Sequence, residues 1–206
     1  MKSLFPELDK HIIDFDDTTI TDDRKKLLNP IIQDLQQKLT QKEAIRLNFI
    51  CTHNSRRSHF AQIWGQTLAY YFGIPNVSCY SAGTEATALF PSVLKTLEDK
   101  GFQITTLSDG KNPIYSIKYG SNTPPIIGFS KTIDHSFNPK TDFIAIMTCS
   151  HADEGCPFIA GAERRFAFTF DDPKAFDNTS KAQEAYQNTS LQIANQLHYI
   201  FSKLKP

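Results

Sequence analysis

The stretch IRLNFICTHNSRRS, residues 45–58, decides how we interpret this chain. Its first six residues predict a strand over Ile45–Ile50, and a helix is predicted to begin at about Ser58. The loop between them would turn its backbone N–H groups, and the positive end of the helix, toward a bound anion. The guanidinium of Arg57 can bind two oxygens of such an anion at once. The stretch therefore predicts a strand, an anion-binding loop and a helix, in that order.

Cys51 ends the predicted strand and opens the loop. The positive field of the loop, with the Ser58 hydroxyl in reach, should lower the pKa of this thiol and make it a thiolate nucleophile. The opposing interpretation is a buried cysteine beside a solvated Arg57 that caps nothing. The residues expected to hold the anion are Thr52, His53, Asn54, Ser55, Arg56 and Arg57.

Composition and charge exclude several classes of protein. The chain has 206 residues, of which 40% are hydrophobic, and this is enough for one packed core. The formal net charge is zero, so we expect neither a nucleic-acid partner nor a membrane anchor. The first seven residues lack the apolar run of a signal peptide, and the cytoplasm is the expected location. The four cysteines then indicate reactive or buried thiols rather than a disulfide framework.

Strands and helices alternate from residue 45 onward. The strands are predicted at residues 45–50, 77–80, 143–147 and 165–170, and the helices at residues 58–72, 91–100 and 180–204. The continuous apolar run Phe143–Met147 is typical of a central parallel strand. This pattern predicts a doubly wound α/β fold with a mostly parallel sheet, whose ligand lies at the carboxyl ends of the strands.

Residues 1–44 are predicted to be a helical extension of a catalytic domain at residues 45–206. Asp22–Leu28 can form a helical turn or two, after which Asn29 and Pro30 are expected to be the N-cap and first residue of a second helix. One face of that helix would pack on the core or on a second subunit, and a regulatory arm is the alternative. The residues of this face are Ile31, Ile32, Leu35 and Leu39.

Residues 110–142 interrupt the alternation of strands and helices. Ile114–Lys118 and Pro125–Lys131 are separated by a polar turn, which predicts an inserted hairpin. Such an insertion either decorates an edge of the domain or covers its active site.

Two further residues, Cys149 and Asp172, are predicted to lie at the same edge of the sheet as Cys51. Cys149 directly follows the predicted central strand, and Cys156 comes seven residues later. These two thiols can bridge if the segment coils, whereas a straight helix would hold them about 10 Å apart. They can also be inert buried thiols. No zinc site is expected, because zinc requires four ligands at short paired spacings. Asp172 follows the last predicted strand and can protonate a leaving oxygen, unless it belongs to an ordinary turn.

Together these motifs resemble the low-molecular-weight protein tyrosine phosphatase superfamily, and within it the thioredoxin-coupled arsenate reductases. The family's loop Cys-x-x-Asn-Ser-x-Arg-Ser is matched by residues 51–58. Its Tyr-Ser-Ala-Gly and Asp-Asp-Pro segments are matched by residues 80–83 and 171–173. The reductase branch adds a strand ending in cysteine and a Cys-x6-Cys-Pro segment, here residues 148–157. The resemblance covers residues 45–206 apart from the insertion, and it implies a flavodoxin-like fold.

The resemblance implies an arsenate reductase, and we expect neither a cofactor nor a metal in this chain. Cys51 would attack arsenate, with Asp172 protonating the departing oxygen. Cys149 would then attack Cys51 and release arsenite, and Cys156 would attack Cys149, so that a thioredoxin-type reductant finally reduces a Cys149–Cys156 disulfide.

Two other functions use the same residues. The first is a phosphomonoesterase that forms a cysteinyl-phosphate on Cys51, with a phosphate ester as its substrate. Phosphotyrosine is disfavoured as its substrate. The tyrosine phosphatases carry aromatic residues after Asp-Pro that pack on the substrate ring, whereas Lys174 and Ala175 follow Pro173 here. The second is a non-enzymatic oxyanion or redox sensor that acts through the N-terminal helix.

The chain also departs from the family pattern. His53 stands where the family usually has glycine, at a position expected to need a positive φ. Gln62 and Leu107 replace residues that contribute to a potassium site in some reductases, although Asn54, Ser81 and Asp109 remain. No potassium ion is therefore expected.

Overall fold

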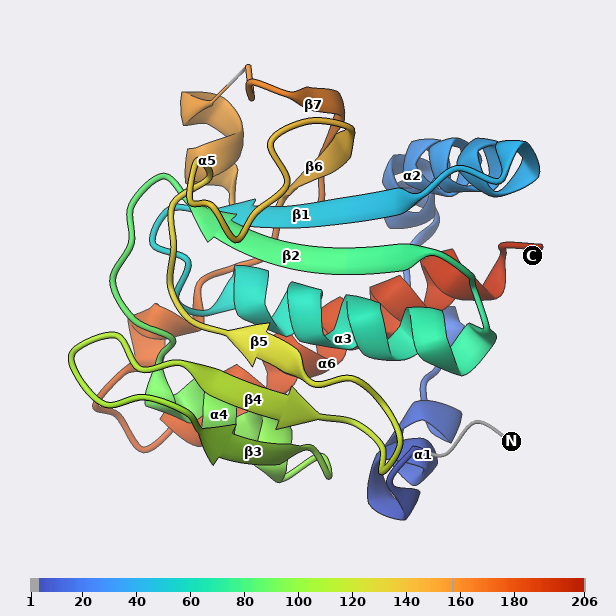
Figure 1. The fold of residues 1–206 in the computed structure, drawn as a ribbon. Coiled ribbons are helices and arrows are strands. Elements are labelled where there is room, and N and C mark those ends of the chain that lie inside the picture. Colours follow the sequence, from blue (N-terminus) through green and yellow to red (C-terminus); the bar gives the residue numbers. More distant parts are fainter. Residues whose placement is uncertain (1–3, 157, 206) are drawn as a thin grey trace.

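A computed structural model describes residues 4–156 and 158–205, and its centre is a four-stranded parallel sheet (Figure 1). The strand order is β2-β1-β6-β7. These strands are β1 (Ile45–Cys51), β2 (Val77–Gly83), β6 (Phe143–Met147) and β7 (Ala162–Ala167). Every residue of β6 is buried, which confirms the prediction of a central strand. Cys51 pairs with Gly83, so that the carboxyl ends of β1 and β2 meet at one edge.

Helices cover both faces of this sheet, which confirms the doubly wound α/β prediction. The face that carries Leu47 and Phe49 belongs to the large core shared with α3 (Arg57–Phe72), α6 (Ala182–Ser202) and α2 (Asp22–Gln41). The opposite face carries a smaller cluster under the short helix α5 (Ser150–Gly155). The four expected core residues of α3 are all buried, namely Phe60, Ile63, Trp64 and Leu68. The helix α4 (Pro91–Glu98) packs against α6 and ends before Gly101, whose φ is +93°.

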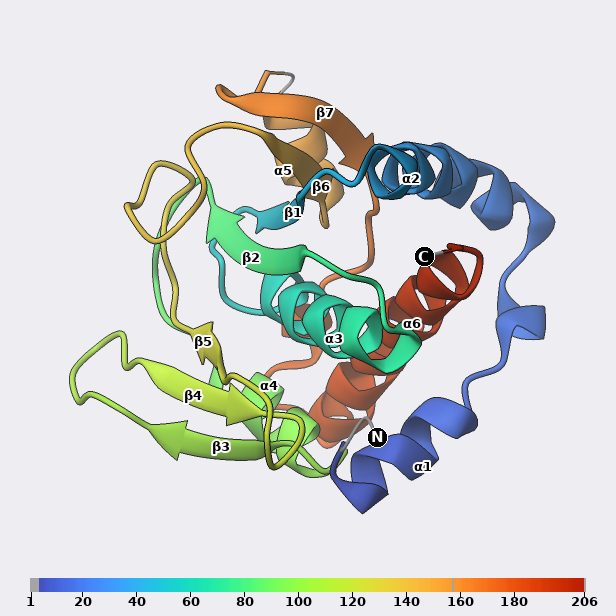
Figure 2. The ribbon, with the colours of Figure 1, turned by 45° about the vertical axis from the view of Figure 1, so that its right-hand side comes forward.

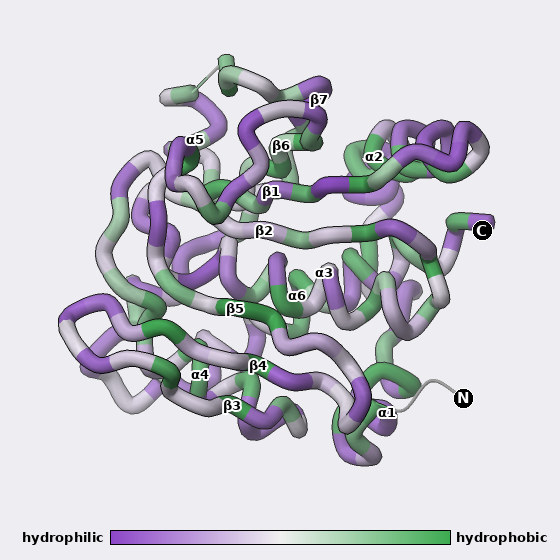
Figure 3. The backbone as a smooth tube through the Cα atoms, viewed as in Figure 1, coloured by the Kyte–Doolittle hydropathy of each residue, from purple (hydrophilic) through white to green (hydrophobic). Residues whose placement is uncertain are grey.

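The N-terminal residues form α1 (Pro6–Ile13), the 3₁₀ turn η1 (Asp17–Thr19) and α2 (Figure 2). The prediction of a second helix beginning at Asn29 and Pro30 is wrong, because α2 runs unbroken from Asp22 to Gln41 with Pro30 inside it. Thr21 caps the helix by accepting the N–H of Arg24. A proline in the interior removes a single hydrogen bond, and the apolar stripe on both sides of it holds the helix to the core. Figure 3 shows the apolar and polar residues that alternate along α2.

The insertion contributes β4 (Tyr115–Lys118) and β5 (Ile126–Gly128) to a separate antiparallel sheet, whose third strand, β3 (Gln103–Thr106), precedes the insertion. The pairing of β4 with β5 confirms the predicted hairpin. The strand β3 was not predicted, because its residues are mostly exposed and show no apolar pattern. In Figures 1 and 2 this sheet lies beside α3 and α4, away from the parallel sheet. After β5 the chain returns to the parallel sheet, where Thr132 forms an isolated parallel bridge with Gly83.

Strand β7 begins and ends three residues earlier than predicted, at Ala162 and Ala167. The residues after it, 168–172, are therefore a connection that leads past the end of the sheet to the 3₁₀ turn η2 (Pro173–Phe176). Within the described residues, no helix has the length and apolar character that crossing a membrane requires.

Candidate active site

The loop between β1 and α3 is held by bonds to its carbonyl groups. The carbonyls of Cys51 and Thr52 accept the N–H groups of Thr84 and Glu85, at 3.2 and 2.8 Å. The carbonyl of His53 accepts the hydroxyl of Ser130 at 3.0 Å. Because these carbonyls are bound by the neighbouring chain, the peptide N–H groups on the other side of the loop are available to an anion.

The positive φ in this loop belongs to Asn54, at +42°, and not to His53 as expected. Asparagine tolerates this conformation better than most residues. The side chain of Asn54 also holds it there, because Oδ1 accepts the backbone N–H of Lys131 and Nδ2 donates to Ser58. Gly83 leaves room for the loop. A Cβ at this position would lie 2.7 Å from the nitrogen of Asn54 and 2.3 Å from the carbonyl oxygen of Glu85.

Cys51 and Ser58 lie together at the base of the loop, as predicted. The Sγ of Cys51 is 3.1 Å from the Oγ of Ser58, and both side chains are buried. Since Ser58 Oγ already accepts a hydrogen bond from Asn54 Nδ2 at 2.9 Å, its own hydrogen is free to be donated to the sulfur. A hydroxyl that donates to Cys51 stabilises the thiolate form.

Arg57 and Asp172 form an ion pair across the mouth of the loop. The guanidinium of Arg57 lies 2.5 Å from the Asp172 carboxylate and donates to the carbonyl of Phe170 at 2.7 Å. The Asp172 carboxylate also accepts the backbone N–H of Lys174. These groups share a pocket of about 380 Å³, which is lined by Cys51, Thr52, His53, Ser55, Arg56, Arg57, Glu85, His151, Asp172 and Lys174.

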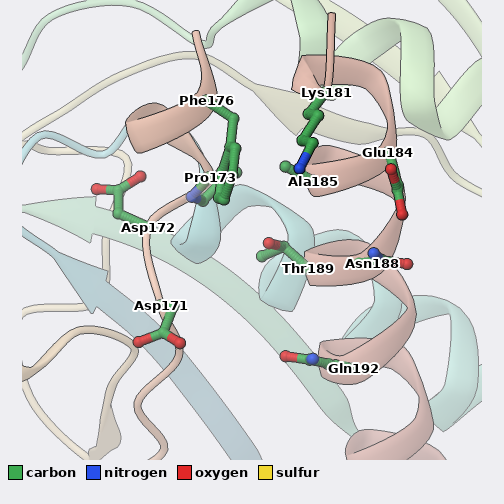
Figure 4. Close-up of a pocket in the computed structure, with 10 residues that line it drawn as sticks. All are labelled: Asp171, Asp172, Pro173, Phe176, Lys181, Glu184, Ala185, Asn188, Thr189 and Gln192. Atoms are coloured by element: carbon green, nitrogen blue, oxygen red, sulfur yellow. The ribbon is translucent and has the colours of Figure 1, made fainter. Parts of the chain in front are cut away.

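A second pocket, of about 320 Å³, adjoins Asp172 between η2 and α6 (Figure 4). In that view the Asp172 carboxylate points away from α6, whereas Thr189 and Gln192 reach from α6 toward the gap. Asp172 therefore stands on the wall between the two pockets.

The guanidinium of Arg56, expected to bind the anion, is engaged elsewhere. It donates to the hydroxyl of Tyr186 at 2.5 Å and to the carboxylate of Asp177 at 2.6 Å. It also lies over the ring of Phe90, 4.0 Å from its centroid. The Arg56 side chain thus links the loop to α6 and to Asp177 after η2. Only the backbone N–H of Arg56 is left to bind an anion. Asp177 and Tyr186 lie more than a hundred residues further along the chain, so the sequence around Arg56 contains no signal for these contacts.

Cys149 belongs to the same small buried cluster as Cys51. Its side chain accepts the N–H of Ala152 and so caps α5, and its Sγ lies 3.6 Å from the hydroxyl of Thr52. Cys156 stands at the other end of α5, half-buried against the same cluster. All four cysteines are free thiols. The Pro157 of the predicted Cys-Pro motif lies outside the described residues.

Arg165 of β7, which sequence reasoning did not single out, fixes the far end of α5. Its guanidinium lies 2.6 Å from the Asp153 carboxylate and donates to the carbonyl of Cys156 at 3.0 Å. A movement of Cys156 toward Cys149 therefore has to break these contacts.

The residues behind the loop do not fit a potassium ion. Gln62 uses its amide group as a donor to the carbonyls of Cys79 and Ile127. Ser81 accepts a hydrogen bond from the ammonium of Lys131 at 3.2 Å, so a cationic side chain already lies there. Asp109 is exposed, and no group of three His, Cys, Asp or Glu side chains suited to a metal occurs among residues 4–156 and 158–205.

Comparison with known proteins agrees with this geometry. A family model described as low molecular weight phosphotyrosine protein phosphatase matches residues 46–114, which include β1, the loop, α3 and β2. An arsenate reductase of Halalkalibacterium halodurans is 29% identical over 137 residues, which cover 66% of this chain and 80% of that protein. An arsenate reductase of Bacillus cereus is 31% identical over 125 residues, covering 61% and 74%.

Solved structures of low sequence identity share the fold. A low molecular weight phosphotyrosine phosphatase from Vibrio cholerae superposes with a TM-score of 0.54 at 16% identity, over 77% of this chain and 95% of that one. An arsenate reductase from Archaeoglobus fulgidus gives a TM-score of 0.50 at 15% identity, over 76% and 99%.

Proposed function

The chain belongs to the low molecular weight phosphotyrosine protein phosphatase family of enzymes, and from this premise we propose that it reduces arsenate to arsenite. The observation that carries the proposal is the common buried cluster of Cys51 and Cys149, with Cys156 packed against it. A phosphatase requires the first of these thiols alone. The curated relatives at about 30% identity are arsenate reductases, which supports the same choice.

The first step uses the loop, Arg57 and Asp172. Arsenate binds to the loop N–H groups and takes over the guanidinium of Arg57, which releases Asp172 from its ion pair. The Cys51 thiolate attacks arsenic while Asp172 protonates the departing oxygen, which leaves as water. The product is a thioester of arsenic acid on Cys51.

The second stage passes the oxidation outward along the cysteines. The Cys149 thiolate attacks the sulfur of Cys51, and the electron pair of the S–As bond goes to arsenic, which leaves as arsenite. Cys156 then attacks Cys149 and releases the Cys51 thiolate, leaving a Cys149–Cys156 disulfide. An external dithiol of the thioredoxin type reduces this disulfide by exchange. The helix α5 separates the two sulfurs by its own length, so it has to unwind for this step.

The decisive experiment measures arsenite release with thioredoxin, thioredoxin reductase and NADPH. Wild type is compared with Cys149→Ser and Cys156→Ser, and Cys79→Ser is the matched control because Cys79 is buried away from this cluster. We expect arsenate-dependent NADPH oxidation in wild type and in the control variant. We expect a single turnover at most in Cys156→Ser and none in Cys149→Ser. Equal turnover in all four proteins would refute the relay.

Phosphate ester hydrolysis is the second candidate, favoured by the Arg57–Asp172 pair beside Cys51. The first half of the reaction is the same, with a phosphoryl group on Cys51 and water as the second nucleophile. Hydrolysis of p-nitrophenyl phosphate by the same proteins separates the two. Hydrolysis that is unaffected in both cysteine variants, without any arsenite, would establish a phosphatase.

A further inference from the structure

Lys131 is a buried cation that the proposed reaction does not use. Its side chain is 1% exposed, and its ammonium donates to Ser81 Oγ and to the carbonyl of Phe129, at 3.2 and 3.3 Å. The ring centroids of Phe129 and Phe137 lie 4.6 and 5.5 Å from Nζ. No carboxylate forms an ion pair with it among the described residues. Burying an ammonium without a carboxylate destabilises a fold, so this lysine needs another explanation.

The side chain of Lys131 begins a chain of hydrogen bonds that runs to the anion loop. Ser81 accepts from the ammonium, so its own hydroxyl hydrogen can be donated to Nδ1 of His59, 3.3 Å away. Burial lowers the pKa of His59 to about 3, and this histidine is therefore neutral. With Nδ1 as the acceptor, Nε2 carries the hydrogen and donates it to the carbonyl of Asn54 at 2.9 Å.

The main chain of Lys131 begins a second chain of hydrogen bonds that ends on Cys51. The backbone N–H donates to Oδ1 of Asn54 at 2.8 Å, Nδ2 of Asn54 donates to Ser58 at 2.9 Å, and Ser58 lies 3.1 Å from Cys51 Sγ. The side-chain oxygen of Asn54 thus accepts a hydrogen bond from the backbone N–H of Lys131. The backbone carbonyl of Asn54 is linked to the Lys131 ammonium through His59 and Ser81. In both chains every donor points away from Lys131 and toward the loop, and such aligned bonds strengthen one another.

We propose that Lys131 is a positioning residue: its ammonium fixes the orientation of the hydrogen bonds through Ser81 and His59 to the carbonyl of Asn54, and Asn54, held in this way, supports the Ser58–Cys51 hydrogen bond that stabilises the thiolate. The inference rests on the proposed function only in taking Cys51 as the nucleophile. The groups that face the ammonium are Ser81 of β2, His59 of α3 and the two phenylalanine rings of its own segment. His59 is neutral, so the ammonium is the one positive group of this set. Burial lowers the pKa of Lys131 to about 7, which leaves it charged under mildly acidic conditions.

The test is the reactivity of Cys51 toward iodoacetamide, measured by peptide mass spectrometry from pH 4 to 9. This readout needs neither arsenate nor a reductant, so it is independent of the proposed reaction. Lys131→Met keeps the backbone N–H and the length of the side chain but removes the charge. We expect alkylation of Cys51 near pH 6 to be about three- to tenfold slower in this variant, because its thiolate is less stabilised. Lys140→Met is the control, because Lys140 is exposed and nine residues away, and it should leave the profile unchanged.

Stability distinguishes positioning from a merely structural role. Replacing an unpaired buried ammonium by an apolar side chain should raise the urea midpoint of Lys131→Met or leave it unchanged. A slower Cys51 in an equally stable protein is the result that we expect. A folded Lys131→Met whose Cys51 is alkylated at the wild-type rate across this pH range would overturn the proposal. If this variant does not fold, Lys131→Gln and Ser81→Ala give the same readout, and unchanged Cys51 profiles in both would overturn it equally.

Discussion

Replacing Arg56 by methionine tests whether this side chain braces the anion loop or binds the anion. The Arg56 side chain is 10% exposed and the Asp177 side chain 18%. Arg56→Met leaves the Asp177 carboxylate with the Tyr186 hydroxyl as its remaining side-chain partner. Removing one partner of a buried ion pair costs about 3–5 kcal/mol. Because some water reaches Asp177, we expect the lower end, a loss of about 3 kcal/mol.

The assay is urea denaturation followed by tryptophan fluorescence, since Trp64 is buried in the core. With a slope of about 2–3 kcal/mol per molar urea, the expected loss lowers the midpoint by about 1–1.5 M. Arg56→Met combined with Asp177→Asn should lose less than the sum of the single variants, because the second change neutralises the stranded carboxylate. Lys26→Met is the control. Lys26 pairs with Asp23 on the surface, and its loss should cost less than about 0.5 kcal/mol.

A different pattern would refute this reasoning. If Arg56→Met unfolds at the wild-type urea concentration while its KM for arsenate rises tenfold or more, Arg56 acts on the anion. A double variant whose loss equals the sum of the two single losses would likewise show that Arg56 and Asp177 do not interact in solution.

Three further substitutions test the site. Gly83→Ala puts a Cβ 2.7 Å from the nitrogen of Asn54. We expect the free energy of unfolding to fall by about 3 kcal/mol and turnover to fall at least tenfold, measured by urea denaturation and activity assays. Gly155→Ala is the control, because a Cβ there meets nothing within 4 Å and should change neither quantity. His59 has a folded pKa of about 3 against 6.5, so the unfolded chain takes up its proton first as the pH falls. Stability should therefore drop between pH 6.5 and 3, by on the order of 4 kcal/mol, and urea midpoints at pH 7 and 4 should differ less in His59→Gln. Asp172→Asn should slow single-turnover arsenite formation by about 10² to 10⁴-fold and leave the alkylation of Cys51 unimpaired.

The parts of the fold that the sequence predicts are those with a local physical cause. Residues 45–72 carry strand, loop and helix signals in succession, and β1, the loop and α3 follow them closely. Cys149 was placed near Cys51 because parallel strands end at one edge, and both lie in one buried cluster. Pro30 misled the prediction because a helix start and a tolerated interior proline look alike in sequence.

The parts that escaped prediction depend on contacts between distant segments. Arg56 was expected to bind the anion together with the rest of the loop, yet its guanidinium contacts Asp177 and Tyr186, more than a hundred residues further along the chain. Lys131 was predicted only as the last residue of a hairpin strand. Its ammonium lies beside Ser81 because the chain returns from the insertion to β2, which no local sequence pattern indicates. The positive φ of Asn54 follows from bonds on its side chain rather than from the residue types around it.

The return of the insertion to the parallel sheet limits how this enzyme can be trimmed or recombined. Ser130 and Lys131 bind the carbonyl of His53 and the carboxamide of Asn54, and the carbonyl of Lys131 accepts the N–H of Gly83. A chimaera that exchanges residues 110–142 for the short connection of a compact relative would strip these bonds from the loop. The insertion therefore cannot be exchanged as an independent unit. A replacement segment must supply the same hydrogen bonds to His53, Asn54 and Gly83.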